Sequence, residues 1–289
     1  MHRAVGRGIL PAALLAALTT VAACGFWGDG DSRTDVTPSG SAHADPASLA
    51  ALRAAEKATS KAGSARIAST TVMGDMLSMK TDGTLGWAGA STGRLELTYT
   101  GGQLAETMRK LNSSTMEARL LPDAYYAKVG EEFAAQIHGK HWIKYDYDDL
   151  ESLPGGSGTS LTEQLANTAP TSPVKLLLAS GDLRKVGEEK VRGKSTTHYS
   201  GTVNAADLEG ADALKKQLEQ AGVTKETVDI WVDGDDLLVK KVEKGELTTG
   251  SMSSTAYYSD YGVRVLAQEP PASDTADFRE LLNSQSATP

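Results

Sequence analysis

The chain has 289 residues, with 37 acidic and 29 basic side chains and a formal net charge of -8 at pH 7. So acidic a chain is a poor candidate for binding nucleic acid or anionic head groups through a diffuse basic face, and we expect no nucleic-acid partner. Cys24 is the only cysteine, which excludes an intramolecular disulfide.

The N-terminal segment has the features of a lipoprotein signal peptide. Arg3 and Arg7 precede an apolar stretch at residues 9–21, and the sequence Val-Ala-Ala-Cys ends at Cys24. This ending resembles the lipobox of lipoprotein signal peptidase, so we expect residues 1–23 to be removed and Cys24 to be lipidated. A membrane-spanning helix is the alternative, but it needs about 20 apolar residues. Two or more acyl chains, such as palmitate, would hold the protein on the extracytoplasmic face of the cell membrane.

The composition then divides the mature chain into three parts. Residues 24–45 contain the lipidated cysteine and a stretch rich in Gly, Ser, Asp, Thr and Pro, which is typical of a flexible tether. Residues 46–271 repeat one pattern of strands and helices, and we expect them to form a single domain. Residues 272–289 are predicted to be a partly ordered tail, in which Phe278, Leu281 and Leu282 are available to dock.

The first predicted element of the domain is a helix at residues 46–62. Pro46 suits the first turn and Gly63 follows the end, while apolar residues recur at helical spacing. After Gly63 the apolar period changes to two, which predicts antiparallel strands around residues 77–87, 94–99, 115–120, 125–129 and 142–145.

The second half of the domain mixes helices with further strands. Residues 160–180 predict two short helices broken by proline, and residues 205–221 a long amphipathic helix. Strands are expected at 186–191 and 195–203, in a hairpin at 228–243, and at 247–249 and 252–258. The predicted fold is α+β: a large curved antiparallel sheet, an incomplete barrel, wrapped on helices packed across its concave face.

A curled sheet covered by helices can enclose an apolar space for a hydrophobic ligand. The residues that alternate toward the predicted interior are the candidate lining of this cavity, although an ordinary packed core is the alternative for each of them. Small residues such as Ala118, Ala127 and Gly201 fit either close approach of a lipid or tight helix packing. The candidate lining residues are Leu77, Met79, Leu85, Leu95, Leu97, Met116, Leu120, Tyr125, Val129, Tyr199, Val203, Ile230 and Val232.

Four segments and the order of elements point to a known family. Residues 186–194 read VGEEKVRGK, residues 197–199 THY, residues 228–233 VDIWVD and residues 258–263 YSDYGV. With the lipobox and tether, they resemble the actinobacterial lipoproteins of the LppX/LprG type, whose fold is similar to that of the lipoprotein carrier LolA. The resemblance implies an incomplete barrel that in some members holds acyl chains of envelope lipids, and a protein of an export or transport system as a further partner.

The sequence offers no convincing catalytic or metal site. His138, His141 and His198 lack zinc-ligand spacing, and His198 is expected on a solvated strand face opposite Tyr199. The acidic clusters at residues 146–151 and 233–236 lack the spacing of a calcium loop and fit turn chemistry better. After acylation of Cys24, no cysteine thiol remains as a nucleophile. We therefore expect no enzyme activity, no cofactor and no metal.

Two functions fit these observations. The first is a membrane-anchored protein that binds or carries a hydrophobic ligand, such as an acyl-chain lipid of the cell envelope. The second is an accessory lipoprotein with a filled core that binds a partner through exposed aromatic side chains. For the second, the expected surface consists of Tyr126, Trp231, Tyr257, Tyr258 and Tyr261.

Overall fold

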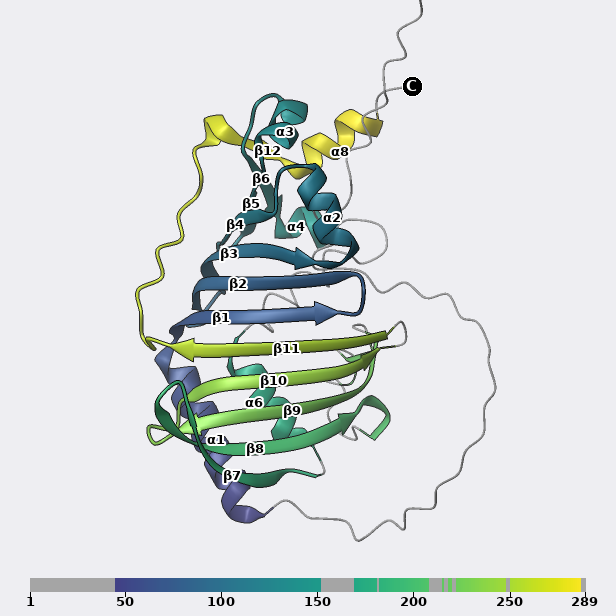
Figure 1. Cartoon of the computed structure of the whole chain (residues 1–289). Helices are drawn as coiled ribbons and strands as arrows, with labels where there is room; N and C mark the ends of the chain where they lie inside the picture. The colour runs from purple at the N-terminus through teal and green to yellow at the C-terminus, as the bar shows by residue number, and fades with distance from the viewer. Residues whose placement is uncertain are drawn as a thin grey trace, which may run out of the picture.

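The computed structural model describes residues 45–151, 169–180, 182–207, 215, 218–219, 222–247 and 250–286. Twelve strands form one open sheet in the order β12-β6-β5-β4-β3-β2-β1-β11-β10-β9-β8-β7. Neighbouring strands are antiparallel except β12 and β6, which are parallel. Figure 1 shows the sheet as one continuous layer, with helices α1 and α6 behind its lower part. The predicted α+β fold with a large curved antiparallel sheet is confirmed.

Helix α1 (Pro46–Ala62) begins and ends where the sequence predicts. The side chain of Asp45 accepts a hydrogen bond from the backbone N–H of Ser48 at 3.0 Å, and Pro46 occupies the first turn. Gly63 ends the helix in the left-handed conformation, with φ of 71°, which suits a residue without a Cβ. Leu52 and Ala55 are fully buried, so α1 packs along one side of the sheet.

The first half of the sheet is a run of neighbouring strands. It contains β1 (Ser64–Met73), β2 (Leu77–Gly86), β3 (Thr92–Gly101), β4 (Thr115–Leu120), β5 (Ala124–Lys128) and β6 (Trp142–Asp146). The connections carry α2 (Gly102–Lys110), α3 (Glu131–Ala134), η2 (Ala135–Ile137) and α4 (Tyr147–Glu151). The sequence pattern did not reveal α2, whose nine residues begin at a pair of glycines.

The second half of the sheet is built from the later part of the chain. It contains β7 (Arg184–Val191), β8 (Lys194–Asn204), β9 (Val223–Asp233), β10 (Leu238–Leu247) and β11 (Gly250–Ser259). Helix α6 (Thr171–Ala179) packs against β8 and β9, and α1 packs against α6. The short helix η3 (Ala205–Asp207) starts where a long helix was predicted; most of that helix, and the first of the two predicted short helices, fall outside the described residues.

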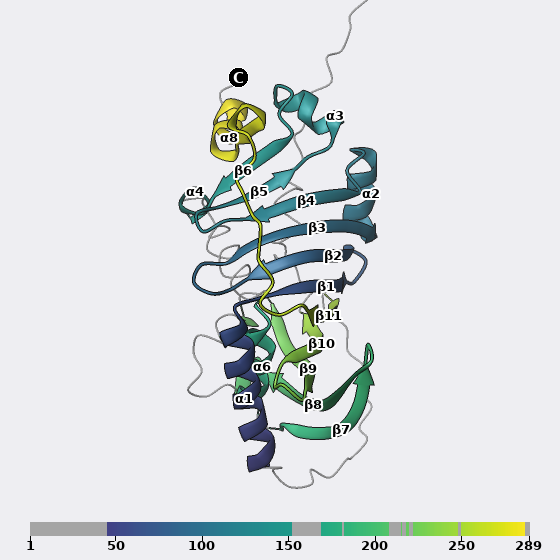
Figure 2. The same ribbon diagram turned by 90° about the vertical axis from the view of Figure 1, so that its left-hand side faces the viewer.

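The C-terminal segment returns to the first half of the sheet. Figure 2 shows residues 260–271 running past the ends of the strands, from β11 to the far end of the sheet. There η4 (Ala272–Asp274) leads into β12 (Thr275–Asp277), which pairs with β6, and α8 (Phe278–Ser286) follows. Phe278 packs on Tyr145 with ring centroids 4.7 Å apart. The segment predicted as a partly ordered tail therefore adds a strand and a helix to the domain.

The concave side of the sheet carries the two large apolar clusters of the described residues. One, here called the upper core, lies among β2–β6, α2, α3 and α4, and includes Leu97, Met116 and Phe133. The other, the lower core, lies between β8–β11 and helices α1 and α6, and includes Leu52, Leu177 and Ile230. In the described part of the chain, no helix is long and apolar enough to cross a membrane.

Candidate functional site

The residues predicted to face the interior all pack into these two cores. Leu77, Met79, Leu85, Leu95, Leu97, Met116, Leu120, Tyr125 and Val129 belong to the upper core, in which Met79 and Leu95 are partly buried. Tyr199, Val203, Ile230 and Val232 belong to the lower core. These residues therefore divide between two ends of one face of the sheet, and their role as the lining of a ligand cavity stays a prediction.

Small polar side chains occupy the middle of the concave face, between the two cores. Ser69 on β1 pairs with Ala256 on β11 and with Thr81 on β2, so these residues share one face with the lower-core residue Ala256. Thr71, two positions along β1, places its Oγ1 3.4 Å from Oγ of Ser254. The concave face is therefore apolar at both ends and polar across its middle.

Charged side chains on β9 and β10 extend this polar middle into the lower core. Lys241 pairs with the buried residues Ile230 and Ala256, so its side chain lies on the concave face. Its Nζ is 2.7 Å from Oε2 of Glu243, and both side chains are nearly buried, with 12% and 14% of their surface exposed. Glu226, near the start of β9, is 6% exposed on the same face. We call Glu226, Lys241 and Glu243 the buried charge cluster.

A β-bulge explains why the sequence pattern missed this cluster. Leu238 pairs with Val232 and Lys240 with Trp231, which leaves Val239 as an extra residue in β10. The extra residue reverses the alternation of the strand, because successive side chains point to opposite faces. Lys241 and Glu243 consequently face the interior, whereas Val239 packs with Trp231 on the convex face.

Burial and neighbouring charges set the protonation of the cluster. Burial, together with the negative charge of Glu243, raises the pKa of Glu226 to about 8, so its carboxyl is largely protonated at neutral pH. Burial alone would lower the pKa of Lys241, but the charge and hydrogen bond of Glu243 outweigh it and raise the pKa. At neutral pH the cluster thus holds one ion pair and one neutral carboxyl group.

Tyr258 places a phenol beside the buried charge cluster. It is 3% exposed and lies on β11, two residues from the direct partner of Lys241. Burial raises its pKa to about 12, against an opposing effect of the Lys241 charge. Among the buried side-chain nitrogen and oxygen atoms of the described residues, its hydroxyl oxygen is the one without a hydrogen-bond partner. A buried hydroxyl without a partner is costly, so this atom requires an explanation.

The surroundings of Gly201 distinguish between close approach of a lipid and tight helix packing at this position. A Cβ at this position would lie 2.8 Å from Cδ2 of Leu177 and 2.6 Å from Oγ of Ser180. Leu177 belongs to α6 and Ser180 caps it, so the glycine permits close approach of a helix to β8. At this small residue, the feature observed is tight helix packing.

The convex face corrects the predicted aromatic surface. Trp231 is only 6% exposed, because His198 stacks on it with ring centroids 4.2 Å apart and Lys240 Nζ lies 3.7 Å from its ring centroid. His198 is itself held by Glu189 and Asp229, at 3.3 and 2.8 Å, so the expectation of a solvated histidine is also wrong. His198 does lie on the face opposite Tyr199, as predicted.

The other predicted surface aromatics are also covered. Tyr126 is 3% exposed and packs with Trp142, whose ring Arg119 covers at 4.4 Å. Tyr258 faces the lower core, because it alternates with Tyr257 along β11. Tyr257, half-buried, lies 3.7 Å beneath the guanidinium of Arg192. Tyr261 donates a hydrogen bond to the carbonyl of Leu238 at 2.6 Å. These side chains do not form a continuous exposed aromatic surface.

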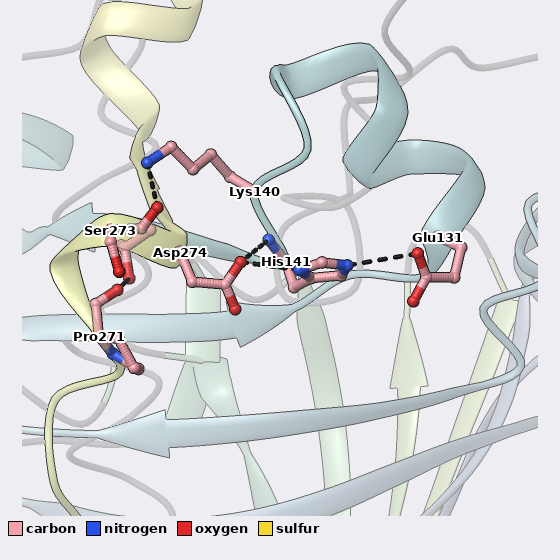
Figure 3. Close-up of polar contacts among 7 residues, drawn as sticks. Glu131, Lys140, His141, Pro271, Ser273 and Asp274 are labelled. Carbon is pink, nitrogen blue, oxygen red and sulfur yellow. Dashed lines mark hydrogen bonds and ion pairs between the residues drawn. The ribbon is translucent and has the colours of Figure 1, made fainter.

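A polar clasp holds the C-terminal segment to the upper half of the sheet (Figure 3). His141 lies between two carboxylates, with Nδ1 2.7 Å from Oδ1 of Asp274 and Nε2 3.3 Å from Oε2 of Glu131. Lys140 donates a hydrogen bond to the carbonyl of Ser273 beside it. The hydrogen bonds to Asp274 and Glu131 raise the pKa of His141. We call the contacts of Lys140 and His141 with residues 273–274 the C-terminal clasp.

The described residues contain no group of three or more His, Cys, Asp or Glu side chains arranged to hold a metal ion. Asp233 instead accepts hydrogen bonds from the backbone of Asp235 and Leu237 and pairs with Lys194 at 2.9 Å, which is the role of a turn residue. A groove of about 440 Å³ lies beside this turn. It is lined by Glu188, Glu189, Lys190, Ser195, Thr196, Thr197, Val232, Asp233 and Gly234.

Comparison with known proteins gives two extensive sequence matches, while no protein-family profile matches the chain. A protein of Streptomyces coelicolor named "Putative lipoprotein SCO4650" is 51% identical over 293 residues, which cover 96% of this chain and 97% of that protein. A protein of Streptomyces griseus, named "Uncharacterized 31.2 kDa protein in rplA-rplJ intergenic region", is 49% identical over 251 residues, covering 83% of this chain and 82% of that protein.

Two solved structures match the chain at low sequence identity. The lipoprotein LppX of Mycobacterium tuberculosis matches 78% of this chain and 100% of its own, with a TM-score of 0.50 and 20% identity. LprF of Mycobacterium bovis matches 79% of this chain and 99% of its own, with a TM-score of 0.49 and 16% identity. The fold of the chain is therefore similar to that of LppX, as the sequence resemblance implied.

Proposed function

Because this chain belongs to the family of the Streptomyces coelicolor protein named "Putative lipoprotein SCO4650", we propose that it is a membrane-anchored extracytoplasmic lipoprotein that binds or carries a hydrophobic ligand. An acyl-chain lipid of the cell envelope is the ligand class that fits best. The proposed role is non-enzymatic: the protein shields the ligand from water.

The observation that carries this proposal is the one-sided apolar face of the curved sheet. Strands β2–β6 and β8–β11 contribute apolar side chains to the same concave face, and helices α1 and α6 lie across its lower part. A concave apolar surface covered by helices suits burial of acyl chains, because removal of apolar surface from water stabilises the complex. The LppX-like fold supports the same arrangement.

The anchor is tested through Cys24, which lies outside the described residues. The full-length protein and a Cys24→Ser variant are expressed in an actinobacterial host that is fed labelled palmitate, and membranes are separated from soluble fractions. We expect label and membrane association for the unchanged protein and neither for the variant. Equal membrane association of both would overturn the lipid anchor.

The ligand is tested on the same membrane-derived protein. Native mass spectrometry, followed by organic extraction, should show a lipid bound in stoichiometric amount after the detergent is removed. A clean apo mass, with no uptake of a hydrophobic dye, would overturn the carrier proposal.

One observation favours the second candidate, an accessory lipoprotein with a filled core. The proposed lining residues pack against other residues of the chain, and most of them are buried. Under this alternative the apo mass is the expected result of the same experiment. A bound lipid would exclude it.

A further inference from the structure

The buried charge cluster is unusual for the interior of a small apolar core. Charged side chains lose several kcal/mol of hydration when they are buried, and an apolar replacement is often at least as stable. Here Lys241 and Glu243 form an ion pair beside Val228 and Ile230, both of which are fully buried. Glu226 lies on the same face, where burial and the charge of Glu243 disfavour its ionised form. The cluster is therefore costly to the fold.

The hydroxyl group of Tyr258 makes this cost larger. This hydroxyl is buried and has no hydrogen-bond partner among the described residues. A phenylalanine would fill the same apolar space without that unfavourable group. Besides burial, the charge of Lys241 lowers the pKa of Tyr258 and that of Glu243 raises it. Two independent features, a charge cluster and an unpartnered donor, thus meet on the concave face.

A β-bulge in β10 places the side chains of Lys241 and Glu243 on the concave face. The bulge at Val239 turns Lys241 and Glu243 inward, and without it both would face the convex side. They adjoin the polar middle of the face, where Thr71 and Ser254 lie between the two cores. Polar groups therefore stand next to apolar surface, which is the arrangement that an amphiphile requires.

We propose that Glu226, Lys241, Glu243 and Tyr258 bind the uncharged polar head of an amphiphile whose acyl chains lie on the adjoining apolar surface. This inference rests on the proposed function and specifies the chemistry of its ligand. The ion pair of Lys241 with Glu243 is neutral overall, and a protonated Glu226 and the Tyr258 hydroxyl donate to carbonyl or hydroxyl oxygens. An anionic head would meet the carboxylate of Glu243, so ester and hydroxyl groups are the chemistry selected.

The test compares ligands that share one alkyl chain length. The delipidated full-length protein is titrated at pH 6 with monolauroylglycerol, dodecane and dodecyl phosphate, and the displacement of a bound hydrophobic dye is measured. We expect monolauroylglycerol to bind about tenfold more tightly than dodecane, as one or two net hydrogen bonds allow. Dodecyl phosphate binding more tightly than monolauroylglycerol would overturn the proposal.

Tyr258→Phe is the decisive variant, because the Tyr258 hydroxyl has no hydrogen-bond partner among the described residues. We expect it to leave dodecane binding unchanged and to weaken monolauroylglycerol binding about 2- to 10-fold, the effect of one hydrogen bond. Tyr126→Phe is the matched control, since Tyr126 is also 3% exposed but lies in a separate cluster with Trp142. An unchanged ratio of the two affinities in Tyr258→Phe would overturn the proposal.

Glu226→Gln gives a second, independent measurement. The amide keeps a donor at every pH, so this variant should prefer monolauroylglycerol at both pH 6 and pH 9, whereas the unchanged protein should lose part of its preference at pH 9. Equal preference of the unchanged protein at both values would contradict a role for Glu226. Failure to bind any of the three probes would instead contradict the carrier function itself.

Discussion

Asp274 receives two contacts from His141, one from the ring at 2.7 Å and one from the backbone N–H at 3.0 Å, across 133 positions of sequence. Together with the parallel pairing of β12 and β6, these contacts attach the C-terminal segment to the sheet. Because the second ring nitrogen faces Glu131, the clasp is strongest when the imidazole is protonated and both carboxylates are ionised.

The C-terminal clasp should therefore loosen as pH rises. The pKa of His141 is raised by Asp274 and Glu131, so its stabilising contribution is complete below the ordinary histidine pKa and is lost as pH rises through the raised value. Asp274, whose pKa His141 lowers, contributes above the ordinary aspartate pKa. Hydrogen exchange of residues 275–277, corrected for intrinsic rates, should be faster at pH 8.5 than at pH 5.5. In His141→Gln this difference should vanish; its persistence would contradict the mechanism.

Glu226 should make the free energy of unfolding fall with pH. Its pKa is raised to about 8 in the folded protein, so its stabilising contribution is present below the unfolded value of about 4.3 and is lost as pH rises through 8. Glu226→Gln should remove this loss and stabilise the protein at pH 9 on the order of 2 kcal/mol, with a smaller effect at pH 6. Urea unfolding at the two pH values measures the difference. An equal effect at both would show that Glu226 titrates normally.

Glu243→Gln makes the same chemical change as Glu226→Gln, but it should destabilise the protein. It leaves the ammonium group of Lys241 buried without its 2.7 Å partner. Loss of one member of a buried ion pair costs roughly 3 to 5 kcal/mol. Urea unfolding at pH 7 should therefore show a strong loss of stability. A neutral result would mean that water reaches Lys241.

Gly201→Val should destabilise the packing of α6 on β8. The new side chain would collide with Leu177 and Ser180, where even a Cβ lies closer than 3 Å to both. Overpacking of this kind costs about 1 to 3 kcal/mol. Gly187→Val is the control, because no atom lies within 4 Å of its Cβ position. Thermal unfolding of the two variants should differ clearly, and equal melting temperatures would contradict the close contact.

Trp231→Ala should lower the stability of the protein more than it lowers the binding of a partner. Its ring is covered by His198 and Lys240, and its indole N–H donates to Glu189 at 2.5 Å. Removing so large and well covered a side chain should cost about 2 to 4 kcal/mol. Denaturant unfolding measures this cost. Unchanged stability together with loss of partner capture from membranes would restore the exposed aromatic surface that the sequence suggested.

Much of the fold follows from local sequence signals. The Asp45, Pro46 and Gly63 boundaries of α1 depend on capping chemistry within a few residues, and the two-residue period revealed most strands. Local signals do not predict the division into two cores, because that division depends on which strands, distant in sequence, pair with each other. β1 and β11, which join the halves, are separated by almost the whole domain.

The buried charge cluster shows a different limit of sequence reasoning. Residues 240–244, Lys-Lys-Val-Glu-Lys, have the composition of a solvent-exposed strand. One extra residue at Val239 reverses their alternation, and a bulge of this type has no clear local signature when the extra residue is valine. The same bulge turns Val242 toward Trp231 on the convex face. The assignment of faces therefore required the register of β10 against β9.

The pairing of β1 with β11 also constrains the order in which the chain can fold. The pair extends from Arg66 and Ser259 to Met73 and Met252, and it forms the middle of the sheet. A chain that emerges N-terminus first can form the β1–β2 hairpin early, but the opposite edge of β1 waits for residues near position 259. Such long-range pairing is intrinsically slow. The strand order thus leaves the middle of the sheet incomplete until nearly all of the polypeptide is available.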